Sequence, residues 1–464
     1  MNVAFVNRVD ELAALERWWA GPAGAIGIVW GRRRVGKTAL LEHFAAGRRA
    51  VFHTGARRPA PDELRILSAE AAPALGGSFR DLAARPFADW TDAFETLAAA
   101  AADEPLLLVL DEVPELIEVV PELPSILRAV WDRLRPRTKL RVLLCGSAVR
   151  TMEAMQEQRE PLYGRFDLAL TLHPMRPHEV ALMLPSLAPA ERALVWGIVG
   201  GVPQYLSLWD QSRDVASNLA TLVANPAGQL LVEGELVMAT EGGHGELTSQ
   251  VLYAIAAGRT KFNEIRDAVR TDPTRTLERL RALRLIERML PVTEDERHTR
   301  RRLYRIADNF LAFWLGAVSR HRSQIELGLG QTILPVLLRE LDDHMGARWE
   351  EAFRAHLRRL ADAGELGAEV VAIGPYWSTG SVAGDANEID AVVLRGRERA
   401  AALVGEAKWA RRVDGARLRW ELEQKARALP RVAAGLTYAV GARDEVAGGE
   451  GLLRVTARDV FSTA

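Results

Sequence analysis

Two glycines, a lysine and a threonine near the start of the chain have the spacing of a phosphate-binding loop. In AIGIVWGRRRVGKTALLEHF, an apolar run enters a turn that carries Gly31, Gly36, Lys37 and Thr38, the pattern GxxxxGK[ST]. Glycines let successive backbone N–H groups and the following helix N-terminus point at phosphate oxygens. Lys37 would reach the β- and γ-phosphates, and the Thr38 hydroxyl would bind Mg²⁺. The pattern predicts a site for ATP and Mg²⁺, and the alternative is a glycine-rich turn with an incidental lysine.

Two acids end a second apolar run, as the partner of such a loop requires. EPLLLVLDEV reads as a buried strand that ends in Asp111 and Glu112. We expect Asp111 to hold Mg²⁺ through water and Glu112 to act as a general base toward the attacking water. A third run leads to Ser147, which would sense the γ-phosphate or lie in an ordinary turn. Arg165 precedes another run and would either reach a phosphate as an arginine finger or pair with an acid.

A second group of chemically active residues lies far along the chain, in NEIDAVVLRGRERAAALVGEAKWA. If 389–395 and 401–407 pair as an antiparallel hairpin, Asp390 stands opposite Glu406, with Cβ atoms about 5 Å apart. Lys408 lies two residues beyond Glu406 and points to the same face by the strand period. Carboxylates bind Mg²⁺ or Mn²⁺, and a lysine beside them can orient or help to deprotonate a water aimed at phosphorus. The spacing therefore predicts a metal-dependent phosphodiester-cleaving site.

These three residues form the D…(D/E)xK pattern, which resembles the restriction-endonuclease-like superfamily. That superfamily commonly supplies another acid from an upstream helix, here GARWEEAFRAHLRRL, where Glu350 is a better match than Glu351. Glu388 is either an additional ligand or a solvated neighbour. The alternative is a nuclease-derived fold whose hairpin carries surface salt bridges without catalysis.

Residues 248–305 between these sites have the pattern of a winged helix. Apolar residues recur at helical spacing through three short segments, and two short apolar runs then bracket a polar turn. The basic candidates for contact with DNA lie on the third helix and in the wing: Arg275, Arg279, Arg284 and Arg301. Such residues would neutralise phosphates and seat the helix in a major groove. A solvated face, or a module that packs against a neighbour, is the alternative.

Length and composition limit the remaining possibilities. A chain of 464 residues with 48% hydrophobic and 26% charged residues is expected to form about three globular domains. The net charge of -1 means that any nucleic-acid surface must be local. A single cysteine favours a reducing compartment, and no apolar run is long enough for a bilayer, so we expect a cytoplasmic protein without a membrane partner.

The motifs FVNRVDELAALE, GRRRVGKT, LLLVLDEV, LLCGSA, LYGR and GGVPQYL together resemble the archaeal-type ATPase family, a STAND-like branch of the AAA+ class. The resemblance covers about the first two thirds of the chain. It implies an α/β fold with a five-stranded parallel sheet flanked by helices, followed by a small helical lid and a winged helix. Arg8 matches the family's adenine-side arginine. The resemblance to the domain that follows these ATPases extends over most of residues 340–425.

Four domains are expected from these patterns. They are a P-loop ATPase core at 1–175, a helical lid at 176–240, a winged helix at 241–320 and an α/β nuclease-like domain at 321–464. The sequence favours an enzyme in which nucleotide state controls DNA binding and metal-dependent cleavage, with a homo-oligomer as a further expectation. The second hypothesis is a nucleotide-dependent signalling switch whose C-terminal domain binds a partner without cutting.

Overall fold

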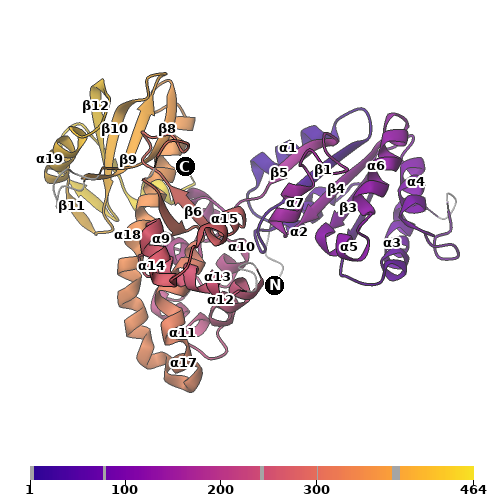
Figure 1. The fold of residues 1–464 in the computed structure, drawn as a ribbon, viewed down its shortest axis with the longest axis horizontal. Helices are drawn as coiled ribbons and strands as arrows, with labels where there is room; N and C mark the ends of the chain where they lie inside the picture. Colours follow the sequence, from indigo (N-terminus) through magenta and orange to yellow (C-terminus); the bar gives the residue numbers. More distant parts are fainter. Residues whose placement is uncertain (1–4, 77–79, 241–244, 300, 379–386, 464) are drawn as a thin grey trace. The chain divides into compact units, whose positions relative to one another are not determined.

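The computed structural model describes residues 5–463 except 77–79, 241–244, 300 and 379–386. The chain forms two compact units, Met1–Pro174 and Met175–Ala464 (Figure 1). The first ends one residue before the boundary expected at 175. The boundaries expected near 240 and 320 lie inside the second unit and remain predictions.

The first unit contains a five-stranded parallel sheet in the order β2-β3-β4-β1-β5. Every residue of the three central strands is buried, which explains why these segments read as continuous apolar runs. The strands are β1 (Ala25–Trp30), β2 (Ala50–Thr54), β3 (Leu106–Asp111), β4 (Leu140–Gly146) and β5 (Phe166–Thr171).

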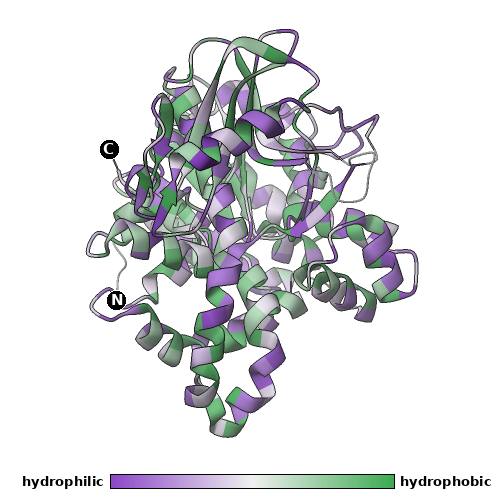
Figure 2. Ribbon diagram, turned by 90° about the vertical axis from the view of Figure 1, so that its left-hand side faces the viewer, coloured by the Kyte–Doolittle hydropathy of each residue, from purple (hydrophilic) through white to green (hydrophobic). Residues whose placement is uncertain are grey.

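Helices cover both faces of this sheet. Alternate residues of β3 and β4 belong to two separate cores, one shared with α1 and α2 and the other with α3 to α6. The helices are α1 (Val9–Trp19), α2 (Lys37–Ala45), α3 (Ala60–Leu75), α4 (Trp90–Ala100), α5 (Val113–Val119), α6 (Leu123–Leu134) and α7 (Val149–Ala154). In Figure 2, hydrophilic and hydrophobic residues alternate along many helices, as expected for helices with one buried face.

The second unit begins with a helical region, α8 (Pro177–Met183), α9 (Pro189–Val199), α10 (Pro203–Ser207), α11 (Val215–Leu222) and α12 (Gln229–Thr240). The GGVPQYL segment joins α9 to α10. A Cβ on Gly201 would lie 1.9 Å from the Met175 carbonyl oxygen, and the Met175 N–H donates to the Gly201 carbonyl. Only glycine permits this close approach of two main chains.

Three helices and an antiparallel strand pair follow, and we call residues 246–306 the helix–hairpin module. It comprises α13 (Glu246–Ala256), α14 (Phe262–Val269), α15 (Thr274–Ala282), β6 (Ile286–Met289) and β7 (Leu303–Ile306). The loop between β6 and β7 docks on a strand of the C-terminal sheet, because the Val292 N–H donates to the Pro375 carbonyl at 2.8 Å. Arg399 also donates to the Val292 carbonyl at 2.8 Å.

The C-terminal part is a mixed sheet in the order β14-β12-β10-β9-β8, with a long helix on one face and a shorter one on the other. The long helix is α18 (Gly330–Asp362), which follows the short α16 (Asn309–Phe313) and α17 (Arg322–Gln324), and the shorter is α19 (Gly415–Ala426). The strands are β8 (Val370–Ser378), β9 (Asn387–Arg395), β10 (Ala400–Ala407), β12 (Val432–Gly441) and β14 (Leu452–Val455); β11 (Arg412–Asp414), β13 (Glu445–Ala447) and α20 (Ala457–Val460) complete the chain.

One continuous core connects the helical region, the helix–hairpin module, α18 and one face of this sheet. The structure confirms three expected features: the five-stranded parallel sheet, the helical region after it and the α/β C-terminal part. Among the described residues, no helix combines the length and apolarity needed to cross a membrane.

Candidate functional site

The glycine-rich turn lies between the carboxyl end of β1 and the start of α2, as its sequence predicts. The Lys37 ammonium donates to the main-chain carbonyls of Gly31 at 2.9 Å and Arg32 at 3.0 Å. A Cβ on Gly31 would lie 2.3 Å from the Leu172 carbonyl oxygen, and Gly36 has φ 92°, so both positions require glycine. The loop thus holds its lysine at the N-terminus of a helix, where an anion is favoured.

The acids of the second motif lie at the end of β3, which is separated from β1 and its loop by β4 alone. The Thr38 hydroxyl donates to Asp111 Oδ2 at 2.6 Å, which brings together the two expected Mg²⁺ ligands. Glu112 has φ 49° and precedes α5, and its Oε2 accepts hydrogen bonds from the Ser147 N–H at 3.2 Å and hydroxyl at 2.9 Å. The structure therefore gathers Lys37, Thr38, Asp111, Glu112 and Ser147 at one edge of the sheet.

The two arginines expected at this site have protein partners. Arg8 is buried, and its guanidinium donates to the Val35 carbonyl of the phosphate loop at 2.8 Å and to Glu11 at 3.0 Å. Arg165 forms a bidentate pair with Asp132, at 2.8 Å for both bonds. Arg8 thus braces the loop itself, and the ion pair is the alternative that the sequence left open for Arg165.

The C-terminal hairpin has the predicted register at its open end. β10 pairs with β9 so that Val404 faces Val392 and Gly405 faces Ala391, which makes Glu406 and Asp390 the next pair. The Ala407 N–H donates to Asp390 Oδ2 at 2.8 Å. Both carboxylate residues are buried. An irregularity between Ala401 and Leu403 does not disturb this end of the hairpin.

Two ammonium groups hold the Glu406 carboxylate. Lys408 Nζ lies 2.7 Å from Glu406 Oε1, and Lys425 Nζ donates to Glu406 Oε2 at 2.8 Å. Burial acts against the charge of Lys408, but the hydrogen bond to Glu406 and the nearby acids outweigh it and raise the pKa of Lys408. Burial, and then repulsion from Glu350 and Glu406, raise the pKa of Asp390 to about 7.

Glu350 joins this group from α18, and Arg354 ties the helix to the strand. Burial, despite the attraction of Arg354, raises the pKa of the Glu350 carboxyl. The Arg354 guanidinium donates to the Asp390 carbonyl at 2.7 Å and lies 3.6 Å from Glu350 Oε2. Glu351 instead pairs with Arg305 of β7 at 3.2 Å. The structure therefore brings together Glu350, Asp390, Glu406 and Lys408, and assigns Glu351 to a different ion pair.

The arginines expected to contact DNA differ in their surroundings. Arg275 and Arg279 are exposed on α15, and neither has a hydrogen-bond or ion-pair partner within the described part of the chain. Arg284 follows the helix with φ 56° and is partly buried. Arg301 is engaged, because it pairs with Glu294 at 2.9 Å and donates to the Trp377 carbonyl of β8 at 3.2 Å.

Comparison with known families identifies the domain that carries the first of these sites. Residues 5–208 match the family described as an ATPase domain predominantly from Archaea. The chain contains a P-loop ATPase domain of this archaeal family. Residues 314–420 match a second family, described as archaeal and bacterial proteins of unknown function.

Two relatives and one solved structure are similar to this chain. An uncharacterized protein of Methanocaldococcus jannaschii is 25% identical over 414 residues, 87% of this chain and 87% of that protein. An uncharacterized ATP-binding protein of the same organism is 52% identical over 42 residues, 9% of this chain and 71% of that protein. The Walker-type ATPase of Pyrococcus abyssi aligns with a TM-score of 0.50 and 20% identity over 67% of this chain and 96% of its own, which shows a shared fold.

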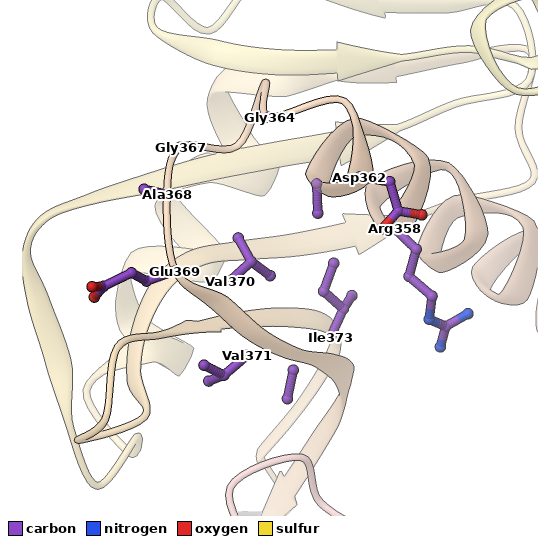
Figure 3. Close-up of a pocket in the computed structure, with 11 residues that line it drawn as sticks. Arg358, Asp362, Gly364, Gly367, Ala368, Glu369, Val370, Val371 and Ile373 are labelled. Atoms are coloured by element: carbon purple, nitrogen blue, oxygen red, sulfur yellow. The ribbon is translucent and has the colours of Figure 1, made fainter.

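Sequence reasoning beyond the ATPase domain missed two basic residues of the C-terminal carboxylate group, Arg354 and Lys425. Arg354 lies on α18 and Lys425 on α19, the two helices that pack on opposite faces of the sheet. The available signal was their position beside the buried stripes of α18 and α19. Cavity size did not point to the C-terminal carboxylate group. A cavity of about 510 Å³ lies between the end of α18 and β8, where Gly364, Gly367 and Val370 line it, and none of the carboxylate group does (Figure 3).

Proposed function

We propose that this protein couples ATP binding and hydrolysis to DNA binding and to metal-dependent cleavage of a phosphodiester bond by its C-terminal domain. The observation that carries the proposal is the strand register that sets Asp390 opposite Glu406, with Lys408 bound to Glu406. Three residues of the D…(D/E)xK pattern thus lie together, and Glu350 adds an acid from α18.

The ATPase domain supplies the nucleotide chemistry through its own residues. The loop N–H groups and Lys37 would bind the phosphates, and Thr38 and Asp111 would position Mg²⁺. Glu112 would accept a proton from the attacking water, with Ser147 holding the carboxylate in place. Arg165 would contact a phosphate, as an arginine finger, only after its ion pair with Asp132 is broken. Arg8 would support adenine binding through the loop that it braces.

The C-terminal residues fit Mg²⁺ or Mn²⁺ by their donor type. Asp390 and Glu406 offer the hard carboxylate oxygens that these cations prefer. Neighbouring carboxylates repel one another, and a bound divalent cation would offset that repulsion. When bound, the cation would activate water and stabilise charge on the phosphate. Lys408 would orient the water, while Glu350 and Arg354 would fix the position of Asp390.

The helix–hairpin module is proposed to bind DNA as a winged helix through α15. Arg275 and Arg279 are exposed and extend along one face of that helix, as phosphate contacts require. The loop between β6 and β7 instead docks on β8, so Arg301 is assigned a minor part in DNA binding. The proposal therefore places recognition on the helix rather than on the wing.

The test is nuclease activity of the purified full-length protein with Mn²⁺ on duplex, branched and single-stranded DNA. Glu406→Ala should abolish cleavage, while Glu421→Ala, on the surface of α19, should retain it. Lys37→Ala should lose ATP binding or turnover, and cleavage that persists in that variant would give the ATPase a regulatory role. Failure of the wild-type protein to cut any of these substrates would refute the catalytic half of the proposal.

A nucleotide-dependent switch with a catalytically silent C-terminal domain is the second candidate. The observation in its favour is that the described residues contain no group of three or more His, Cys, Asp or Glu side chains arranged to hold a metal ion. This candidate predicts slow ATP turnover with nucleotide-dependent assembly. It also predicts that Asp390→Ala retains the biological effect, which separates it from the nuclease.

A further inference from the structure

Another cavity, of about 370 Å³, lies within the second unit, where three parts of the chain meet. The helix–hairpin module, the segment 312–320 and α18 each contribute to its wall. Its volume is near the lower end of the range for small-molecule sites in proteins. Of the described residues, those of the phosphate loop and of the carboxylate group lie outside this wall. The cavity is therefore separate from both sites described above.

Small residues leave the space in this cavity open. Ala256 of α13, Ala312 of α16, Gly316, Ala317 and Ala347 of α18 all line it. A Cβ on Gly316 would meet no described atom closer than the Ala256 carbonyl oxygen, at 4.0 Å. These residues offer an apolar surface with room beside it, which suits an apolar group of a ligand.

The polar part of the wall comes largely from one face of α18. Glu340, Asp343, His344 and Arg348 recur there at helical spacing. Arg348 is buried, and its Nη1 donates to Asn309 Oδ1 at 2.8 Å. Its Nε–H is also buried, and it has no hydrogen-bond partner in the described part of the chain. A buried donor without a partner costs free energy, which an acceptor in the cavity would recover.

Two other arginines of the wall are already neutralised by acids of the protein. Arg305 pairs with Glu287 and Glu351. Arg320 pairs with Glu340 at 3.2 Å. These arginines and Glu340 are therefore not counted as groups that a ligand would contact.

Three polar groups of the wall remain for a ligand: the Arg348 Nε–H, Asp343 and His344 Nδ1. Arg348 Nη1 lies 3.6 Å from Glu351 Oε2, and this ion pair does not use Nε. Asp343 is exposed and has no hydrogen-bond or ion-pair partner among the described residues. Burial lowers the pKa of His344 to about 3, so its ring is neutral. Because His344 Nε2 donates to the Gly197 carbonyl at 2.8 Å, Nδ1 is left as an acceptor.

We propose that this cavity binds a small zwitterion with the chemistry of a free apolar amino acid. The ligand carboxylate accepts the Arg348 Nε–H, and the ligand ammonium donates to Asp343 and to His344 Nδ1. Asp343 and Arg348 are five residues apart, about 7.5 Å along the helix axis, a separation that the length of the arginine side chain can span. The apolar side chain of the ligand lies against the alanines and Gly316. The bound molecule would join the helix–hairpin module to α18, and this role does not depend on DNA binding or cleavage.

The experiment is calorimetric titration of the full-length protein with alanine, valine, leucine and phenylalanine. At least one should bind at millimolar concentration. The amide of that amino acid, which lacks the carboxylate, and the corresponding carboxylic acid without the amine should each bind roughly 10- to 100-fold more weakly, as expected for loss of a charge-assisted contact.

Variants locate the binding. Arg348→Met should weaken it roughly 10- to 100-fold. Asp343→Asn changes an exposed residue and should remove most of the preference for the amino acid over its amine-free acid. Gly316→Leu should abolish binding because its side chain fills the cavity. The matched control is Gly346→Leu, which adds the same side chain to α18 outside the wall, where a Cβ meets no described atom within 4 Å; it should bind as wild type does.

Four outcomes would overturn the proposal. The first is that none of the four amino acids binds, and the second is that binding persists unchanged in Gly316→Leu, which would place the ligand elsewhere. Equal affinity for the amino acid and its amide would exclude the carboxylate contact with Arg348. An unchanged preference for the amine in Asp343→Asn would exclude the ammonium contact. Neither ATP turnover nor DNA cleavage is measured, so failure of the proposed function would leave this result standing.

Discussion

Replacement of Asp390 by asparagine should change how stability depends on pH. The pKa of Asp390 is about 7, because burial and the nearby Glu350 and Glu406 disfavour its charge. The usual value in an unfolded chain is about 4. Between these two values the folded protein binds a proton that the unfolded chain has lost, so the free energy of unfolding falls as pH rises.

The magnitude follows from the same pKa. At about 1.4 kcal/mol for each pH unit that separates the folded and unfolded pKa values, ionisation of Asp390 costs the folded protein at most about 4 kcal/mol above pH 7. The cost disappears below about pH 4, where both states hold the proton. Asparagine keeps an oxygen that can accept the Ala407 N–H but carries no charge. The variant should therefore gain stability over wild type progressively from pH 4 to pH 8.

Urea denaturation of both proteins at intervals from pH 4 to pH 8, without divalent cations, measures this difference. Groups that titrate elsewhere cancel when the two curves are subtracted. Asp362→Asn, which changes an exposed acid at the end of α18, is the control and should follow the wild-type profile. Mn²⁺ should stabilise wild type more than Asp390→Asn. A stability difference that is flat across this pH range would refute the reasoning, because it would mean that Asp390 ionises as freely in the folded protein as in the unfolded chain.

Three further predictions concern other parts of the chain. Glu112→Gln should retain ATP binding and lose turnover by a factor on the order of 10²–10⁴, measured as phosphate release; normal turnover would exclude Glu112 as the base. Phe353→Ala should lower the free energy of unfolding by about 3–5 kcal/mol in urea, because its buried ring packs on Gly405 and Gly441; a smaller loss would mean that the sheet closes onto α18. Arg275→Ala and Arg279→Ala should each reduce the slope of log DNA affinity against log salt concentration by about one, the value for one lost phosphate contact. Arg301→Ala should leave the slope unchanged, because Arg301 is already paired within the protein. Equal slopes in all three variants would contradict binding through α15.

The sites were predictable where their chemistry depends on local spacing. Gly31, Gly36 and Lys37 are close in sequence, and a strand followed by a turn and a helix can place them in one way only. The hairpin is similarly local, since a short turn between two apolar runs fixes which residue faces Glu406. Both features can therefore be predicted from the sequence alone.

Long-range packing determines the remainder. Whether Glu350 or Glu351 faces Asp390 depends on the rotation of α18, which is set by contacts with β7 as well as with the sheet. Lys425 reaches Glu406 only because α19 crosses the sheet at a particular position. Asp132, the partner of Arg165, and the Trp377 carbonyl, one of the two partners of Arg301, likewise come from distant segments. Sequence alone allowed these arginines to be either free or paired, and tertiary structure decided between the two.

The main-chain hydrogen bond from Val292 to Pro375 has a consequence for where DNA would be cut. It joins the helix–hairpin module to the sheet that carries Asp390 and Glu406, and the same core continues beneath both. The bond and the core leave little room for the two to swing apart. Under the proposed function, DNA bound to α15 would be cut at a constant number of nucleotides from the bound segment. Lengthening the loop between β6 and β7 would spread those positions.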